Sequence, residues 1–130
     1  MTRKEMKLGK VQLEIMKVLW QYGDATARQI TDELSKTEEI AHSTVQTLLR
    51  KLEAKGAVEH VSERRTFMFR ALIHRSSVAE STAHDLLTRV FHGSVYSLVA
   101  HLIKHEDVSP EELRALKELI DSSSEEDARK

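Results

Sequence analysis

Residues 41–72, AHSTVQTLLRKLEAKGAVEHVSERRTFMFRAL, decide the fold of this chain. A polar run at His42 leads into an apolar stripe at three- and four-residue spacing, which is typical of a helix packed by one face. The stripe stops at Lys55-Gly56. Two short β-like runs, 58–61 and 66–72, then flank a basic tip and predict a hairpin. A helix with a polar, cationic outer face and a basic hairpin directly after it is the layout of a winged helix that binds duplex DNA.

Two further helices are predicted ahead of this stretch. Residues 8–22 carry an apolar helical stripe that includes Trp20 as a core anchor, and Gly23 ends it. Residues 26–35 form a short second helix with Thr26 as its N-cap. After a polar connection, the third helix begins at residue 42 or 43 and runs to about residue 55. This order of helices predicts a helix-turn-helix.

The outer face of the third helix carries two kinds of side chain. Short polar groups near its N-terminus suit base edges, because Gln can form two bonds to adenine and a Thr methyl can pack on thymine. We therefore expect base reading by Ser43, Gln46 and Thr47. Cations and a hydroxyl suit phosphates, and the expected anchors are Thr44, Arg50, Lys51, Arg64 and Arg65.

Lys55 and His42 complete the candidate DNA-binding set. His42 suits either a helix cap or a phosphate contact. Taken singly, each Ser or Thr of the set is equally compatible with capping, and each Lys or Arg with plain solvation. The group is more specific than its members, because short polar and cationic side chains gather on one helix and one hairpin tip.

Charge divides the chain into two unlike parts. Residues 1–75 hold 14 Lys and Arg against 10 Asp and Glu, whereas residues 76–130 hold 6 against 11. A basic part attracts a polyanion and an acidic part does not. With 130 residues, one small domain plus an appendage is expected. We predict a winged-helix domain over 1–75, a helical dimerisation region over 76–121 and a disordered tail over 122–130, in a mainly α protein with a small β wing.

The acidic part reads as three helices with apolar stripes. One covers residues 76–91, a second follows Gly93-Ser94, and a third begins at Ser109-Pro110 with a capping Ser and Pro at the first helical position. Their stripes are too large to bury on one another, so a second copy of the chain is the expected partner in a homodimer. The alternative is that they fold back on the first domain. The expected dimerisation residues are Val78, Leu86, Leu87, Val90, Phe91, Val95, Leu98, Val99, Leu102, Ile103, Leu113, Leu116, Leu119 and Ile120.

Several function classes find no support in the residues. The absence of cysteine excludes a disulfide framework and a zinc-thiolate site. No nucleophile motif, phosphate-binding loop or metal signature occurs, so neither an enzyme nor a cofactor is expected. His101 and His105 are four residues apart, which leaves a metal- or effector-sensing regulator as an alternative. No apolar run is long enough to span a membrane and no signal-peptide core is present, so a cytoplasmic protein without membrane insertion is expected.

The chain resembles the penicillinase-repressor (BlaI/MecI/CopY) family of transcriptional regulators over nearly its whole length. The resemblance is carried by the order and spacing of six segments: LEIMKVLW at 13–20, TVQTLLRKL at 44–52 with Lys55-Gly56, FMF at 67–69, FHGS at 91–94, SLV at 97–99 and SPEEL at 109–113.

This resemblance implies an N-terminal winged helix, a C-terminal dimerisation region and repression through a dyad-symmetric DNA operator. It implies control of genes for β-lactam resistance or related stress, or for copper handling in one branch. That branch senses copper through cysteines, which this chain lacks. Members controlled by a membrane sensor-protease are cut at an Asn-Phe step, and the aligned step here is His101-Leu102, a departure from the pattern. A winged helix used only for protein contact is the remaining alternative, and the polar helix face and basic tip argue against it.

Overall fold

The structure is a computed structural model that describes residues 7–128. The chain divides into two units, Met1–Asp85 and Leu86–Lys130. The boundary lies inside helix α4 (Arg75–Val90), later than the boundary after residue 75 that the charge pattern predicted. The first turns of α4, with the buried Val78, therefore belong to the N-terminal unit.

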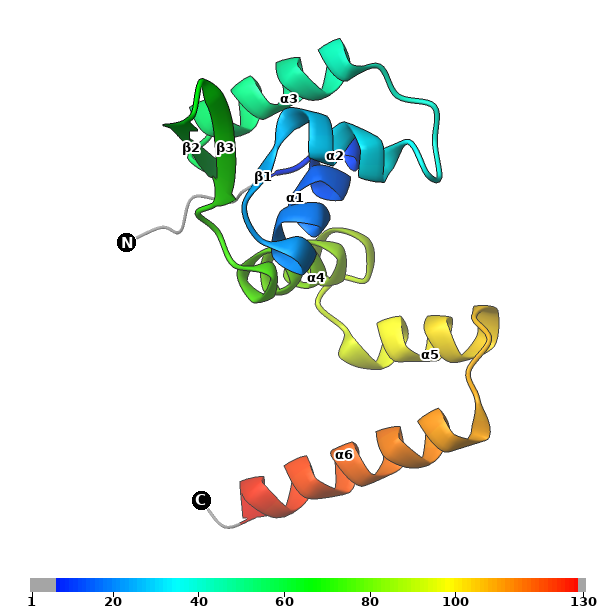
Figure 1. Ribbon diagram of the computed structural model, residues 1–130. Coiled ribbons are helices and arrows are strands. Elements are labelled where there is room, and N and C mark those ends of the chain that lie inside the picture. Colours follow the sequence, from blue (N-terminus) through cyan, green and yellow to red (C-terminus); the bar gives the residue numbers. More distant parts are fainter. Residues whose placement is uncertain (1–6, 129–130) are drawn as a thin grey trace. The chain divides into compact units, whose positions relative to one another are not determined.

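Helix α1 (Lys10–Tyr22) begins after Gly9 and ends at Gly23. Gly23 has a φ of 85°, a left-handed value that favours glycine, and its N–H donates to the carbonyl oxygen of Leu19 at 3.0 Å. The helix lies at the centre of the first unit (Figure 1). Its inner face supplies the core residues Ile15, Met16, Val18 and Leu19.

Helix α2 (Ala27–Leu34) starts with the cap that the sequence predicted. The Thr26 hydroxyl accepts a hydrogen bond from the Gln29 N–H at 3.1 Å, and the Gln29 side chain accepts one from the Thr26 N–H at 2.9 Å. Two backbone donors that the helix cannot satisfy are thereby paired reciprocally. Helix α3 (His42–Ala54) follows, and its stripe of Val45, Leu49 and Leu52 is fully buried against α1 and α2.

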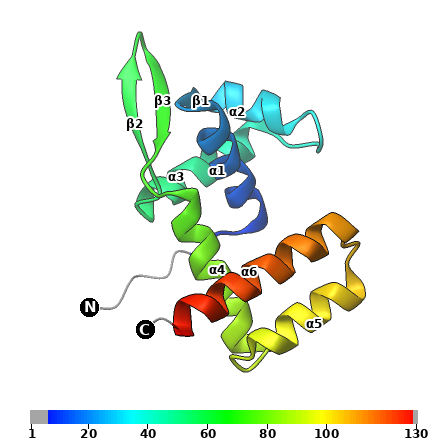
Figure 2. The same ribbon diagram turned by 90° about the horizontal axis from the view of Figure 1, so that it is seen from below.

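A three-stranded antiparallel sheet completes the first unit, in the order β1-β3-β2. The wing is the hairpin of β2 (Val58–Glu63) and β3 (Thr66–Ala71), which extends beside the three helices (Figures 1 and 2). Strand β1 (Ala25–Thr26) pairs with β3 and was not expected, because two residues are too few to show an alternating pattern. The hairpin confirms the predicted change of period after residue 57.

Only one of the two wing phenylalanines enters the core. Phe69 is 8% exposed, whereas Phe67 is 51% exposed because it lies further along the hairpin, past the helices. The alternation Phe67–Phe69 predicted one buried face for the strand. That prediction is correct only at the base of the wing.

The second unit contains helices α5 (Val95–His105) and α6 (Pro110–Ala128). The predicted cap of α6 is present, since the Ser109 hydroxyl accepts from the Glu112 N–H at 3.1 Å. Helix α6 continues to Ala128 without a Gly or a second Pro to interrupt it, whereas the polar composition of residues 122–130 predicts a disordered tail. Residues 129–130 lie outside the described part.

Most apolar residues of the C-terminal helices are not covered by their own chain. No residue of α5 is buried, and Leu119, Ile120 and Val90 are each more than half exposed. Of the α4 residues expected at the dimer interface, only Val78 is buried within its own chain. Within residues 7–128 no single helix is long and apolar enough to span a membrane; α4 and α5 meet that test only as a bent pair.

Candidate nucleic-acid interface

The outer face of α3 presents the residues expected to read bases. Ser43, Thr47 and Arg50 are exposed and follow one another at three- and four-residue spacing, so they share the side of the helix opposite the buried stripe. Gln46 is also exposed. The guanidinium of Arg50 donates a hydrogen bond of 3.4 Å to the Thr47 hydroxyl, which links a predicted anchor to a predicted reader on one surface.

Two further members of the predicted set, Thr44 and Lys51, are exposed on α3. Lys51 lies in the last turn of the helix, where a cation interacts favourably with the helix dipole. Its side chain also lines a shallow groove of about 610 Å³ between the start of α1 and α3. The structure therefore brings six of the predicted contacts, Arg50 among them, together on the exposed surface of one helix.

The wing tip carries Arg64 and Arg65, both exposed. Their φ values of 50° and 69° are positive, as the two central residues of a type I′ hairpin turn require. Such positions favour Gly or Asn, and a side chain there costs roughly 1 kcal/mol per residue. Two arginines in a costly conformation are a functional signal, because the position keeps two cations at the end of the hairpin.

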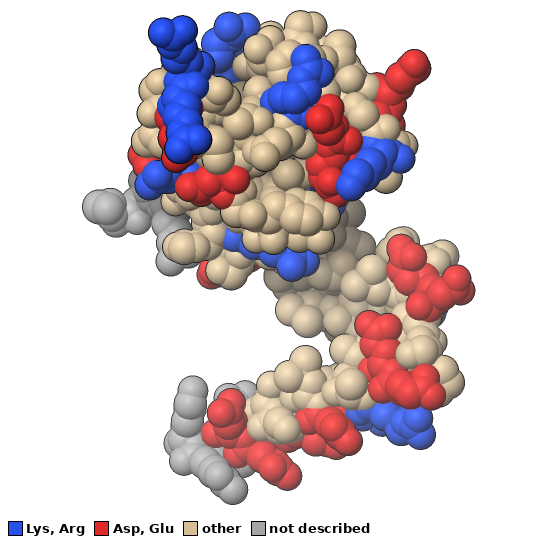
Figure 3. Space-filling view, viewed as in Figure 1, with Lys and Arg blue, Asp and Glu red and all other residues tan. Residues whose placement is uncertain are grey.

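The arginine at the base of the wing is paired with carboxylates. Arg70 lies 3.7 Å from the Glu59 carboxylate and 3.9 Å from that of Asp24, so its charge is balanced at the wing base. Within residues 7–128, neither Arg64 nor Arg65 has a carboxylate partner. Figure 3 shows Lys and Arg side chains gathered over the wing, whereas the C-terminal helices display mainly Asp and Glu.

His42 has a role inside the fold that the sequence did not assign. Its Nδ1 lies 3.0 Å from the hydroxyl of the buried Thr31 in α2, and that hydroxyl donates to the Ala27 carbonyl at 2.8 Å. A hydroxyl has one hydrogen, so Thr31 accepts from His42 and the proton of the imidazole lies on Nδ1. His42 thereby ties the first residue of α3 to the middle of α2.

Lys55, another member of the predicted set, is also engaged within the fold. Its ammonium donates to the Lys7 carbonyl at 2.8 Å and to the Gln12 side-chain oxygen at 3.1 Å. Gln12 in turn accepts from the Gly9 N–H at 2.9 Å. The Lys55 side chain therefore holds the chain ahead of α1 to the end of α3, rather than extending from the outer face.

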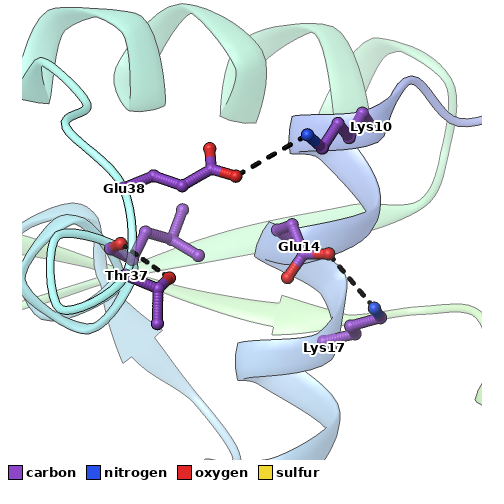
Figure 4. A network of polar contacts seen from close by, with 6 residues as sticks. Lys10, Glu14, Lys17, Thr37 and Glu38 are labelled. Carbon is purple, nitrogen blue, oxygen red and sulfur yellow. Dashed lines mark hydrogen bonds and ion pairs between the residues drawn. The ribbon is translucent and has the colours of Figure 1, made fainter.

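A second tie joins α1 to the loop between α2 and α3. The Lys10 ammonium lies 3.7 Å from the Glu38 carboxylate, and Lys17 pairs with Glu14 one turn further along α1 (Figure 4). The Thr37 hydroxyl donates back to the last turn of α2 at 3.4 Å. The Lys10–Glu38 ion pair thus links α1 to the loop that leads into α3.

Sequence reasoning missed one cluster, in which His60 of β2 lies between α3 and the wing. Its Nδ1 contacts the carboxylate of Glu53 in the last turn of α3, and its ring lies 4.4 Å from that of Phe67 and 5.6 Å from that of Phe69. The available signal was the two-residue spacing from the buried Val58, which places His60 on the inner face of its strand.

His101 and His105 of α5 lie close together, with ring centroids 4.4 Å apart and the Phe91 ring 5.7 Å from His101. Both histidines are exposed. Among the residues that the structure describes, no group of three or more His, Cys, Asp or Glu side chains is arranged to hold a metal ion. The pair therefore offers two of the ligands that a metal site needs.

Comparison with known proteins gives matches across both units. A family model described as penicillinase repressor matches residues 8–122. The penicillinase repressor of Bacillus licheniformis is 31% identical over 119 residues, covering 92% of this chain and 93% of that protein. The methicillin resistance regulatory protein MecI of Staphylococcus aureus is 24% identical over 120 residues, covering 92% and 98%. The solved DNA binding domain of the repressor BlaI is 35% identical, with a TM-score of 0.51, and covers 58% of this chain and 92% of that one.

Proposed function

Because the chain belongs to the penicillinase repressor family, we propose that it represses its target genes as a homodimer on a dyad-symmetric DNA operator. DNA-binding transcriptional repression is the function of the family, and this chain is a repressor of that kind. The names of its relatives refer to penicillinase and methicillin resistance, so we propose genes of β-lactam resistance as targets. The observation that carries the proposal is the exposed polar face of α3 beside an arginine-tipped wing.

The two kinds of contact have separate roles in this proposal. Ser43, Gln46 and Thr47 lie in the first two turns of α3 and read base edges in the major groove. Phosphates are neutralised by Arg50 and Lys51 on the helix and by the arginines of the wing tip. Phosphate contacts set the position of the domain on the duplex, whereas base contacts set the preferred sequence.

The exposed apolar residues of the second unit support the homodimer. Leu102 and Ile103 of α5 are 43% and 44% exposed, and Leu119 and Ile120 of α6 are 63% and 61% exposed. Burial of one such side chain stabilises an assembly by about 1.5–3 kcal/mol. A second copy of the same helices covers both sets, and one copy per half-site explains a dyad-symmetric operator.

Release from DNA is assigned in this proposal to cleavage by a membrane sensor-protease at the 101–102 peptide bond. His101 and Leu102 are both exposed, and they lie in the second half of α5. A cut there would separate the end of α5 and all of α6 from the DNA-binding domain. The check is the mass of the repressor in induced cells: a fragment that ends at His101 supports cleavage, and an intact chain that has left its operator contradicts it.

The central test is selection of bound duplexes from a random pool, followed by titration of the selected site at several salt concentrations. Wild-type affinity is expected to fall steeply with salt, because each neutralised phosphate releases counterions. Arg64→Ala with Arg65→Ala is expected to weaken binding to all duplex sequences alike. It is also expected to reduce the salt slope, the slope of log affinity against log salt concentration, by about 2. Gln46→Ala is expected to relax base preference at one position and to leave the slope unchanged.

The matched control removes two cations from α6, by Arg114→Ala with Lys117→Ala, and is expected to leave the salt slope of the wild type. If the wing variant had the same affinity and salt slope as this control, the assignment of Arg64 and Arg65 as phosphate anchors would be refuted. Binding that ignores both salt and duplex sequence would refute the DNA-binding role of the α3 face itself.

A further inference from the structure

His60 occupies a junction between the helix that reads DNA and the wing that anchors it. Its Nδ1 contacts the Glu53 carboxylate of α3, and a carboxylate only accepts hydrogen bonds, so Nδ1 is the donor. The two side chains are each about one-third exposed, at 33% and 38%. On its other side the imidazole lies against the rings of Phe67 and Phe69. One residue of β2 therefore touches α3 and β3 at once.

The wing beyond this junction has little else to hold it. At the base, Val58 and Phe69 are buried in the core. Further out, Val61 is 40% exposed and Phe67 is 51% exposed. A two-stranded hairpin that leaves the body of a domain is marginally stable by itself. Among the described residues, the His60–Glu53 contact is the outermost side-chain bond between the wing and α3.

The distance from this contact to the wing tip determines how far a small rotation of the wing moves the two arginines. His60 pairs across the sheet with Phe69, and Arg64 follows four residues later. At about 3.3 Å per residue, the arginine tip lies roughly 13 Å beyond His60. A tilt of about 10° at the junction would then move the tip by roughly 2 Å, which exceeds the tolerance of a hydrogen bond to phosphate.

We propose that His60 is a positioning residue for operator binding: its bond to Glu53 sets the angle between the wing and α3 so that both reach one duplex together. The inference rests on the proposed DNA contact of the wing and assigns the residues that direct it.

The test is a double-mutant cycle on the full chain, with the selected operator as the probe. His60→Phe keeps an aromatic ring against Phe67 and removes the donor to Glu53. It is expected to weaken binding about tenfold, the size of one lost charge-assisted contact. His60→Asn keeps a donor near the position of Nδ1 and is expected to restore most of the affinity. Glu53→Gln keeps an acceptor for the His60 imidazole and is expected to lose less operator affinity than Glu53→Ala.

The decisive measurement repeats His60→Phe in the background Arg64→Ala with Arg65→Ala. A positioning role predicts no further loss there, because the contacts that His60 directs are already gone. The same tenfold loss in both backgrounds, or no loss in either, would overturn the proposal. Glu53→Ala provides the same comparison should His60→Phe fold poorly, as judged by circular dichroism. Failure of the proposed function is distinct, since the wild-type chain would then not bind the duplex at all.

Discussion

The indole nitrogen of Trp20 donates a hydrogen bond of 2.9 Å to the carbonyl oxygen of Ile73, which lies 53 residues later in the chain. Trp20 belongs to α1, and Ile73 lies in the short segment between β3 and α4. Both side chains pack against the core, which confirms the anchoring role predicted for the tryptophan. This bond fixes the point at which the chain leaves the wing and begins α4.

Trp20→Phe is therefore expected to destabilise the first unit by about 1–3 kcal/mol, because it removes the donor and leaves the Ile73 carbonyl without its partner. Urea unfolding followed by circular dichroism measures the loss. Tyr96→Phe is the control, since Tyr96 is 83% exposed and the change is expected to stay within about 0.5 kcal/mol. Equal stability of the two variants would show that the bond is dispensable.

Thr31→Val is expected to affect both stability and DNA binding. Val has nearly the shape of Thr, but it removes the hydroxyl that accepts from His42, so the start of α3 loses its tie to α2. The expected cost is about 1–2 kcal/mol of unfolding free energy, with weaker binding to the selected operator. Thr82→Val, which removes an exposed hydroxyl from α4, serves as the control in both assays. Operator affinity equal to that of the control would contradict an orienting role for His42.

Three neighbouring side chains, Tyr22, Glu33 and Lys36, predict a pH dependence in the first unit. The Tyr22 hydroxyl donates to the Glu33 carboxylate at 2.9 Å, and Lys36 pairs with the same carboxylate at 2.8 Å. The bond to Glu33, and then its charge, raise the pKa of Tyr22 above 10.0. The bonds from Lys36 and then Tyr22 lower the pKa of Glu33 below 4.5, and the bond to Glu33 raises that of Lys36.

The direction in which each group changes stability with pH follows from the difference between its folded and unfolded pKa. Because the folded pKa of Glu33 is lowered, its contribution to stability is present above the unfolded pKa and is lost as pH falls through the folded value. Because the pKa of Tyr22 is raised, its contribution is present below the unfolded pKa and is lost as pH rises through the folded value. In a Tyr96→Phe background, Glu33→Ala is expected to move the tyrosinate absorbance change of Tyr22 to lower pH. An unchanged titration would show that the contact is not formed in solution.

Ile120→Glu is expected to convert the proposed homodimer into a monomer, because it places a charge among apolar residues that this dimer would bury. Sedimentation measures the mass, and operator titration is expected to show a loss of at least about tenfold as two linked half-site contacts become one. Ser122→Glu adds the same charge to an exposed polar position of α6 and is expected to remain dimeric. A dimeric Ile120→Glu variant would move the interface away from α6.

Local signals in the chain were enough for most of the elements. Thr26 and Ser109 mark helix starts because their hydroxyls cap the backbone of the turn that follows, and Gly23 marks an end because its φ is positive. The same kind of signal placed α3, whose polar outer face can be predicted from residue spacing alone. The extent of α6 was underestimated, since a polar run such as 122–128 is compatible with both a tail and a helix.

The roles of individual side chains were decided only by tertiary structure, because they depend on residues that are far apart in the sequence. Residue spacing places Lys55 and His42 beside the candidate DNA contacts. In the folded chain, however, Lys55 donates to the Lys7 carbonyl and His42 bonds to the Thr31 hydroxyl. Strand register, which no local pattern of this hairpin specifies, brings His60 against Phe67 and Phe69. Period and composition thus determine which helices and strands form and which face of each is polar. Packing determines which of the polar groups remain free for DNA, because each group that finds a partner inside the fold is withdrawn from the surface.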